Sequence, residues 1–326
     1  MITISVCMIV KDEERVLDRC LASLRPIADE IIIVDTGSSD DTKEIAAQYT
    51  DRVFDFLWRD DFAAARNYAF SKATKEYIYS ADADEVLDED NLLKVRSLKQ
   101  NLLPEIEIVQ FLYTNQLSCN TTYNFDTELR PKLYKRLREF TWVDPLHESV
   151  RREPLVFDSD IVVVHQPEAF HGKRDFRIYR KAMEEPLGLS SHLQGMYARE
   201  LFITGEPQDF LDAENYFEQL IEQEGISNDR LMEAMCVLAH AAEDRKDTDD
   251  FFRPVLKAFA LGNPSSEICY LLGKHFEDKG DYCEACIWYY NAAYEAEPLL
   301  DIRLGNEFSL DALIHCKKVL GEDYEA

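Results

Sequence analysis

Residues 80–87, with the sequence SADADEVL, place three acidic side chains directly behind an apolar run. Asp82, Asp84 and Glu85 follow Tyr-Ile-Tyr at residues 77–79, and a single alanine separates the two aspartates. Carboxylates at the end of a buried strand cost free energy unless a positive charge compensates them. Residues i and i+2 of an extended strand share a face, so Asp82 and Asp84 are able to converge on one ion. Carboxylate oxygens favour magnesium, calcium or manganese, and a dication site is therefore expected here.

An isolated Asp-x-Asp is usually a solvated turn, so this expectation needs support from the surrounding pattern. That pattern supplies the support. Strand-like runs occupy residues 3–10, 30–35, 52–56 and 76–82, and helix-like runs occupy 13–26, 40–49 and 62–73. The alternation predicts an α/β domain with a mostly parallel sheet and helices on both faces. Ligands in such sheets bind at the carboxyl ends of the strands. Asp35 and Asp82 each end a strand-like run, so both are expected to face one crevice.

In the second half of the chain the apolar residues recur with a different spacing. The best further strands are residues 105–116 and 160–166, and from about residue 190 helical patterns replace strands. Three segments, 195–223, 231–262 and 268–297, predict helix pairs, enough for a small solenoid. In the last segment the residues at tetratricopeptide-like spacings are Leu272, Gly273, Phe276, Gly280, Tyr282, Ala285, Tyr289 and Ala292, with Pro298 near the end. We therefore expect an α/β domain over residues 1–180 and an all-α repeat domain over 181–326, the latter being a packing module, a homodimer interface or a groove for a peptide or protein.

Composition limits the partners. The 326 residues carry 36 basic and 63 acidic side chains, a formal net charge of −27, which argues against a nucleic acid or an anionic membrane surface as the main partner. No secretory leader and no apolar run of about 18 residues is visible. We therefore expect a cytoplasmic location and no membrane insertion. The eight cysteines lie mostly in apolar patterns, which indicates reduced core thiols, and a structural role is expected for the Cys283-x-x-Cys286 pair as well.

Three motifs together carry a family resemblance: VDTGSSDDT at 34–42, FAAARNYA at 62–69 and DADE at 82–85. This combination resembles the inverting family 2 glycosyltransferases, which have the nucleotide-sugar-binding fold called GT-A. The resemblance is strong over residues 2–90 and weak to about 170. Similar enzymes that join such a domain to C-terminal tetratricopeptide repeats include the S- and O-glycosyltransferases that modify bacteriocin peptides, and the lipopolysaccharide-core glucosyltransferases share the same catalytic pattern.

The resemblance implies roles for the residues at the first strand ends. Asp35 should contact the base or ribose of a uridine diphosphate (UDP) sugar, and the strand exit from Val10 to Glu13 should line the nucleotide pocket. This chain has Asp12 where similar enzymes commonly have asparagine. Arg66 should orient the Asp-x-Asp and approach the diphosphate or sugar. The alternatives are a turn or helix-capping aspartate for Asp35 and a surface arginine for Arg66.

A dication follows from the charge of the donor. Two like charges about 4 Å apart repel by roughly 1 kcal/mol in water and about 4 kcal/mol at an effective dielectric of 20, so clustered carboxylates alone would exclude a diphosphate. Mn²⁺ or Mg²⁺ held by Asp82 and Asp84 reverses the sign and stabilises the departing diphosphate. His165, at the end of DIVVVH, resembles the late histidine that closes the metal site in many GT-A enzymes. The alternative for His165 is a merely hydrogen-bonded strand end.

Inversion requires one base that accepts the acceptor proton. The segment FTWVDPLHESVRRE contains Trp142, His147 and Glu148. By resemblance Glu148 is the expected base, and His147 is an alternative base or a metal or phosphate contact; a surface His-Glu dipeptide is the other reading. Trp142 is expected to stack under the sugar or to fill the core. The basic segment 170–181 either binds phosphate, closes over the donor, or is a solvated helix face.

These residues and the resemblance together predict a metal-dependent inverting glycosyltransferase that moves a hexose from a UDP-sugar to an acceptor nucleophile. The resemblance implies that the acceptor is a Ser, Thr or Cys side chain of a peptide or protein. Transfer to a glycan or a lipid-linked saccharide is the alternative acceptor chemistry. A non-catalytic repeat scaffold with a degenerate transferase domain is the alternative from another class.

Overall fold

The computed structural model describes residues 1–114, 127–136, 142–143, 145–146, 149–150, 154–166, 172–184, 188–223 and 225–321. The chain divides into two compact units, Met1–Ile178 and Tyr179–Ala326, where the sequence placed a boundary after residue 180. Within the described residues, none of the helices combines the length and the apolar character needed to cross a bilayer.

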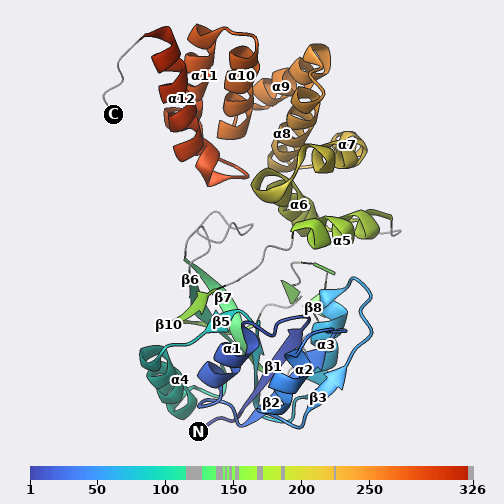
Figure 1. Cartoon of the computed structure of the whole chain (residues 1–326). Helices are drawn as coiled ribbons and strands as arrows, with labels where there is room; N and C mark the ends of the chain where they lie inside the picture. Colours follow the sequence, from blue (N-terminus) through green and yellow to red (C-terminus); the bar gives the residue numbers. More distant parts are fainter. Residues whose placement is uncertain are drawn as a thin grey trace. The chain divides into compact units, whose positions relative to one another are not determined.

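The first unit is an α/β structure (Figure 1). Its strands are β1 (Ile4–Val10), β2 (Glu30–Asp35), β3 (Val53–Asp55), β4 (Tyr77–Ala81), β5 (Glu85–Val86), β6 (Ile108–Thr114), β7 (Glu128–Lys135), β8 (Trp142–Val143), β9 (Ser149–Val150) and β10 (Val156–His165). Its helices are α1 (Leu17–Leu24), α2 (Thr42–Ala47), α3 (Phe62–Lys72) and α4 (Glu89–Asn101), and α5 (Gly172–Glu184) crosses the division between the units.

Eight strands form one mixed sheet in the order β3-β2-β1-β4-β7-β6-β10-β5, and β8 pairs separately with β9. The strands β3, β2, β1 and β4 are parallel, as the alternation of strands and helices predicts. The strand β7 is antiparallel to both of its neighbours, and β5 is antiparallel to β10. The predicted α/β class is confirmed, with these antiparallel additions in its second half.

The two faces of the sheet have separate cores because successive side chains of a strand point to opposite faces. On β1, Ile4, Val6 and Met8 pack on one face with α1, α2 and α4. Cys7 points to the other face, where Ala69 of α3 packs against it. Helices therefore cover both faces, as the sequence predicts.

The strand β7 contains a bulge. The pairing with β6 passes from Val109 opposite Leu133 to Gln110 opposite Pro131, so Lys132 is an extra residue on the β7 side. Proline lacks the N–H that a central strand uses, and a bulge is one of the places where a sheet tolerates it. A bulge also redirects a side chain. Here Lys132 points into the protein and is only 4% exposed.

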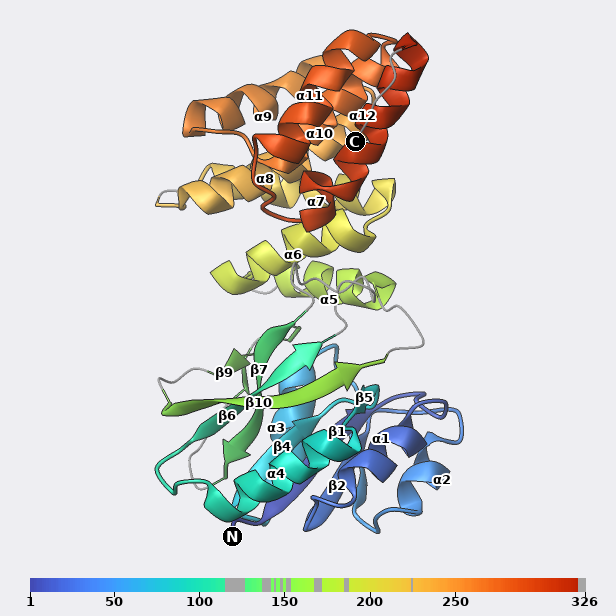
Figure 2. The same ribbon diagram turned by 90° about the vertical axis from the view of Figure 1, so that its left-hand side faces the viewer.

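The second unit is entirely helical in its described residues (Figure 2). Its helices are α6 (Ser191–Thr204), α7 (Pro207–Ile221), α8 (Asn228–Asp244), α9 (Thr248–Leu261), α10 (Ser266–Asp278), α11 (Tyr282–Tyr294), the 3₁₀ helix η2 (Ile302–Gly305) and α12 (Glu307–Leu320). Short turns join α6 to α7, α8 to α9 and α10 to α11, which are the three predicted helix pairs. The helix α8 packs against α6, α7, α9 and α10. The all-α class of this half is confirmed.

Candidate active site

The residues predicted to share a crevice lie at the carboxyl ends of three adjacent parallel strands. On β1 and β2, Val10 and Asp35 lie side by side in register, and Met8 of β1 pairs with Ala81 of β4. Asp82 is the next residue after Ala81. The three strand ends thus bring Val10, Asp35 and Asp82 to one edge of the sheet, as their positions in the sequence predict.

Asp35 is almost completely buried and organises the turn that follows β2. Its Oδ1 accepts hydrogen bonds from the backbone N–H groups of Gly37 (2.9 Å) and Ser38 (3.1 Å), and the Lys43 ammonium lies 3.6 Å from the same oxygen. Gly37 adopts a φ of +108°, a conformation that favours glycine. The structure therefore shows the turn-forming role of Asp35; a nucleotide contact remains a prediction.

The exit from β1 is held by Asp12 and Glu13. Asp12 has a φ of +54°, which aspartate and asparagine tolerate better than most residues, and its Oδ1 accepts the Ser39 N–H at 2.7 Å. Asp12, which stands where similar enzymes commonly have asparagine, therefore makes a structural contact at this turn. The Glu13 N–H donates to Thr42 Oγ1 at 2.7 Å. Burial, followed by the negative charge of Asp84, raises the pKa of the Glu13 carboxyl to about 7.

Residues 82–84 form a turn between β4 and β5 and do not continue the strand, and Glu85 begins β5. The Glu85 N–H donates to the Asp82 carbonyl at 3.3 Å across this turn. The Asp84 carboxylate lies 2.9 Å from His165 Nε2, whereas the Asp82 carboxylate faces Arg66 and Lys132. The expectation that Asp82 and Asp84 share the face of an extended strand is therefore corrected, because the turn sends the two carboxylates to different partners.

Arg66 contacts Asp82 from the helix α3. Its helix α3 begins where the Asp61 side chain accepts the Ala64 N–H at 2.8 Å, an N-cap that fixes the start of the helix. Arg66 is 9% exposed. Its guanidinium donates hydrogen bonds to Ser80 Oγ at 2.6 Å and to Asp82 Oδ1 at 3.3 Å. The alternative of a surface arginine is thus wrong, and Arg66 lies where it orients Asp82.

Lys132 is a second cation at this turn that the sequence analysis did not predict. The bulge residue Lys132 hydrogen-bonds Glu85 Oε1, and its ammonium lies 3.6 Å from Asp82 Oδ2. Glu85 is 1% exposed, and its Oε2 has no hydrogen-bond partner among the described residues. Lys132 thus joins a buried carboxylate to one that is 40% exposed. It is part of the positive charge that compensates this acidic cluster.

The two carboxyl groups that share Lys132 titrate in opposite directions. Burial by itself raises the pKa of Asp82, but Lys132 and Arg66 outweigh it and hold the pKa well below its usual range. Burial, together with the neighbouring Asp82 and Asp84 charges, raises the pKa of Glu85 to about 8 in spite of Lys132. The exposed carboxylate is therefore ionised near neutral pH, while the buried one tends to keep its proton.

Asp82, Asp84 and His165 fit a dication by the chemistry of their donor atoms. Carboxylates and imidazole bind Mn²⁺ or Mg²⁺, and the side chains of Asp82 and Asp84 are 40% and 25% exposed. His165 is the last residue of β10 and pairs with Glu85 of β5, which explains its place beside the turn. Among the described residues, no three His, Cys, Asp or Glu side chains are already converged tightly enough to hold an ion.

The proposed acceptor side is only partly described. His147 and Glu148 lie outside the described residues, as does the side chain of Trp142 in β8, so their predicted roles stay predictions. In the basic segment, the Arg174 guanidinium lies 4.9 Å from the centre of the Phe62 ring, and Arg177 pairs with Asp60 at 2.8 Å. These contacts favour the reading of a helix face packed beside the crevice over a free phosphate site.

The family of this unit follows from a comparison with known proteins. The model of glycosyl transferase family 2 matches residues 5–151, which contain the strand ends, Arg66 and the acidic turn. Residues 5–151 form a family 2 glycosyl transferase domain. The resemblance carried by VDTGSSDDT, FAAARNYA and DADE is thereby confirmed.

The chain resembles curated proteins that are much longer than the regions matched. The chain is 45% identical over 97 residues to a TPR repeat-containing protein of Synechococcus elongatus, covering 30% of this chain and 24% of that protein. It is 29% identical over 144 residues to the SPbeta prophage-derived glycosyltransferase SunS of Bacillus subtilis, covering 42% of this chain and 34% of SunS. The chain thus spans about a quarter and about a third of the lengths of these relatives.

A solved structure that resembles this chain is glucosyl-3-phosphoglycerate synthase from Mycobacterium tuberculosis in complex with Mg²⁺ and UDP. It is 17% identical, with a TM-score of 0.40, and the match covers 58% of this chain and 81% of the synthase.

Proposed function

We propose that this protein is a metal-dependent inverting glycosyltransferase that transfers a hexose from a UDP-sugar to a Ser, Thr or Cys side chain of a peptide or protein. The observation that supports this most is the acidic turn of Asp82 and Asp84 at the carboxyl ends of the parallel strands. Arg66 and His165 contact its carboxylates directly, and Asp35 lies at the end of β2, two strands away along the same edge of the sheet. A family 2 domain provides the matching chemistry.

The residues around the turn divide the work of binding the donor. Asp82, Asp84 and His165 would hold Mn²⁺ or Mg²⁺, which, when bound, neutralises the diphosphate and stabilises the charge that develops on it. Asp35 and the Val10–Glu13 strand exit would contact the nucleoside. Arg66 keeps Asp82 in place through its contacts to Ser80 and to the carboxylate itself.

The transfer step requires a base on the face of the sugar opposite the diphosphate. A lone pair of the acceptor oxygen or sulfur attacks the anomeric carbon and forms the new glycosidic bond. The bond from that carbon to the diphosphate oxygen breaks, and its electron pair leaves with UDP. The acceptor proton passes to Glu148, with His147 as the alternative base, and the configuration at the anomeric carbon inverts.

The peptide acceptor rests on the resemblance to enzymes that join such a domain to helical repeats. The helical unit of this chain supports it by supplying a second, separate surface on which a macromolecular acceptor is able to dock. If a small saccharide is glycosylated and no peptide ever is, the acceptor is a glycan or a lipid-linked saccharide.

Donor binding is tested by calorimetry with a panel of UDP-sugars, with and without Mn²⁺. We expect binding of at least one UDP-sugar that depends on Mn²⁺, and its loss in Asp84→Asn. Asp90→Asn is the matched control, because Asp90 is exposed on α4 and makes no ion pair with another described residue. Full binding in excess chelator, or in Asp84→Asn, would remove the metal role.

The base is tested separately. Glu148→Gln should bind the donor as the wild type does and lose transfer by roughly 10²–10⁴-fold, the usual contribution of general base catalysis. If turnover is unchanged in Glu148→Gln and lost in His147→Gln, the base is His147. If both variants retain transfer, the base lies elsewhere.

A further inference from the structure

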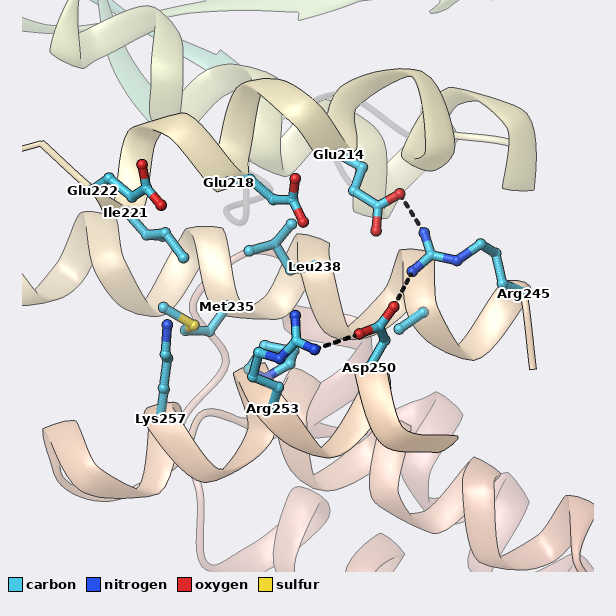
Figure 3. Close-up of a pocket in the computed structure, with 12 residues that line it drawn as sticks. Glu214, Glu218, Ile221, Glu222, Met235, Leu238, Arg245, Asp250, Arg253 and Lys257 are labelled. Carbon is cyan, nitrogen blue, oxygen red and sulfur yellow. Dashed lines mark hydrogen bonds and ion pairs between the residues drawn. The ribbon is translucent and has the colours of Figure 1, made fainter. Parts of the chain in front are cut away.

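A groove in the helical unit combines an apolar floor with charged walls (Figure 3). It encloses about 250 Å³ between α7 and α9, and both of these helices pack on α8 or follow it directly in the chain. Met235 and Leu238 of α8 and Ile221 of α7 supply its apolar surface. The groove therefore lies between the second helices of two successive pairs, with the first helix of the later pair beneath.

The wall formed by α7 is acidic. Glu214 and Glu218 are spaced four residues apart, so they project from the same face of α7, and Glu222 continues this row just past the end of the helix. The facing wall on α9 carries Arg253 and Lys257, also four residues apart. The groove is thus polarised across its width, from carboxylates on α7 to cations on α9.

Ion pairs close one end of the groove. Arg245 pairs with Glu214 and, at 3.3 Å, with Asp250, which in turn pairs with Arg253 at 2.8 Å. Figure 3 shows this chain of contacts running from α7 to α9. Its four charges compensate one another, so this end offers little net charge to a ligand.

The other end is not closed in this way. Glu218, Glu222 and Lys257 make no ion pair with another described residue, and Glu218 and Glu222 are exposed to solvent. Two free carboxylates and one free ammonium therefore surround the apolar patch of Ile221 and Met235. The free charge of this end is negative overall and lies directly beside an apolar surface.

We propose that this groove binds a segment of the peptide acceptor in which one aliphatic side chain is flanked by lysine or arginine. The aliphatic side chain would fill the space over Met235 and Leu238, and the flanking cations would face Glu218 and Glu222. A volume of about 250 Å³ suits one or two side chains rather than a folded domain. The inference rests on the proposed function, because it names the part of the acceptor that is recognised away from the glycosylated residue.

Fluorescence anisotropy on the full chain tests this with three labelled peptides of equal length. One carries Lys-Leu-Lys between Gly-Ser flanks, one carries Glu-Leu-Glu, and one carries Lys-Ser-Lys. We expect the Lys-Leu-Lys peptide to bind at least 10-fold more tightly than either of the others, and its affinity to fall as salt is raised. Equal binding of all three peptides overturns the proposal.

Charge reversal locates the binding surface. The variant Glu218→Lys/Glu222→Lys should weaken Lys-Leu-Lys binding at least 10-fold. The matched control, Glu295→Lys/Glu297→Lys, changes the net charge equally at the end of α11 and should leave binding within about 2-fold of the wild type. Equal losses in both variants would mean that the peptide responds only to the overall negative charge, and the groove would be excluded.

Two further measurements separate the groove from the proposed function and from self-association. Mn²⁺-dependent UDP-sugar binding should be unchanged in Glu218→Lys/Glu222→Lys. If the wild type binds a UDP-sugar but does not prefer the Lys-Leu-Lys peptide, the groove proposal is overturned and the proposed function stands. Light scattering should give the same mass for the wild type and this variant. A smaller mass for the variant would mean that the groove binds a second copy of the chain. That result would overturn the proposal that it binds a peptide.

Discussion

At the scale of residues, Lys132 and Glu85 form a buried pair whose partners depend on each other. At pH 9, above its raised pKa of about 8, Glu85 is ionised, so Lys132→Met leaves its carboxylate buried without a cation, and removing one member of a buried pair typically costs about 3–5 kcal/mol. We expect a loss of roughly 3 kcal/mol in the free energy of unfolding, measured by urea denaturation. In Lys132→Met/Glu85→Leu no unpaired charge remains between them, so at least half of the loss should be recovered.

Lys94→Met is the control for this pair. Lys94 pairs with Asp160 at 2.9 Å on the surface, and exposed pairs contribute about 0–1 kcal/mol. The control should therefore lie within about 0.5 kcal/mol of the wild type. If the losses of Lys132→Met and Glu85→Leu simply add in the double variant, the two side chains do not interact as the structure shows.

Glu85 also predicts a pH dependence of stability. Its pKa is raised to about 8 by burial, so between its ordinary value and pH 8 the folded state holds a proton that the unfolded state has released. The stability from this group is present at low pH and is lost as the pH rises through 8. From pH 5.5 to pH 8.0 the free energy of unfolding should fall in the wild type by on the order of 2 kcal/mol more than it does in Glu85→Gln. Equal pH dependences in the two proteins would contradict this.

The sequence predicted the positions of site residues better than their contacts. Asp35 ends β2 and Asp82 directly follows β4, close to the predicted strand ends, because a parallel strand fixes the location of the residues at its end. Lys132 was missed because it follows a proline in a charged stretch, which reads as irregular, and only the bulge turns it inward. The pairing of Asp84 with His165 depends on a turn whose path periodicity does not specify.

At the scale of elements, Gly273 sets how closely α10 and α11 approach. A methyl group at this position would lie 2.6 Å from atoms of the Tyr289 ring, which is itself buried. Overpacking of this kind costs about 1–3 kcal/mol, more than the gain of about 1 kcal/mol from replacing a helical glycine. Gly273→Ala should therefore lower the free energy of unfolding of the helical unit by roughly 1–2 kcal/mol in urea denaturation.

Gly195 of α6 supplies the matched control. There the nearest atoms to an added methyl group belong to the guanidinium of Arg230, the far end of a flexible side chain that is able to move aside. Gly195→Ala should be neutral or stabilising by up to about 1 kcal/mol. Destabilisation of equal size in both variants would show that the close approach to Tyr289 is not what makes Gly273 necessary.

Elements with a strong period were predictable, and short or irregular ones were not. The runs that became β1, β2 and β4 are almost entirely buried, and the spacing around Gly273 and Tyr289 predicted the α10–α11 pair. The strand β5 has two residues, and β7 carries Pro131 among charged side chains, so neither presents a periodic signal. These are the elements that bring Glu85 and Lys132 to the acidic turn.

At the scale of the whole molecule, the change of period near residue 190 indicated two domains, and the contacts divide the chain after Ile178. The sequence could show this division because a parallel sheet and a helical solenoid bury their apolar residues with different spacings. It could not locate the boundary to the residue, because the division falls inside α5, a continuous helix.

Two compact units with separate cores predict two unfolding transitions in scanning calorimetry. The proposed donor site lies in the unit that contains Asp82 and Asp84, so UDP with Mn²⁺ should stabilise only that unit. At about 100 times the dissociation constant the stabilisation is about 2.7 kcal/mol, which for a unit of this size raises the midpoint by roughly 5–10 °C. Gly273→Ala should lower the midpoint of the other transition. If UDP with Mn²⁺ and Gly273→Ala act on the same transition, the units do not unfold independently, and the crevice and the helical groove are energetically coupled.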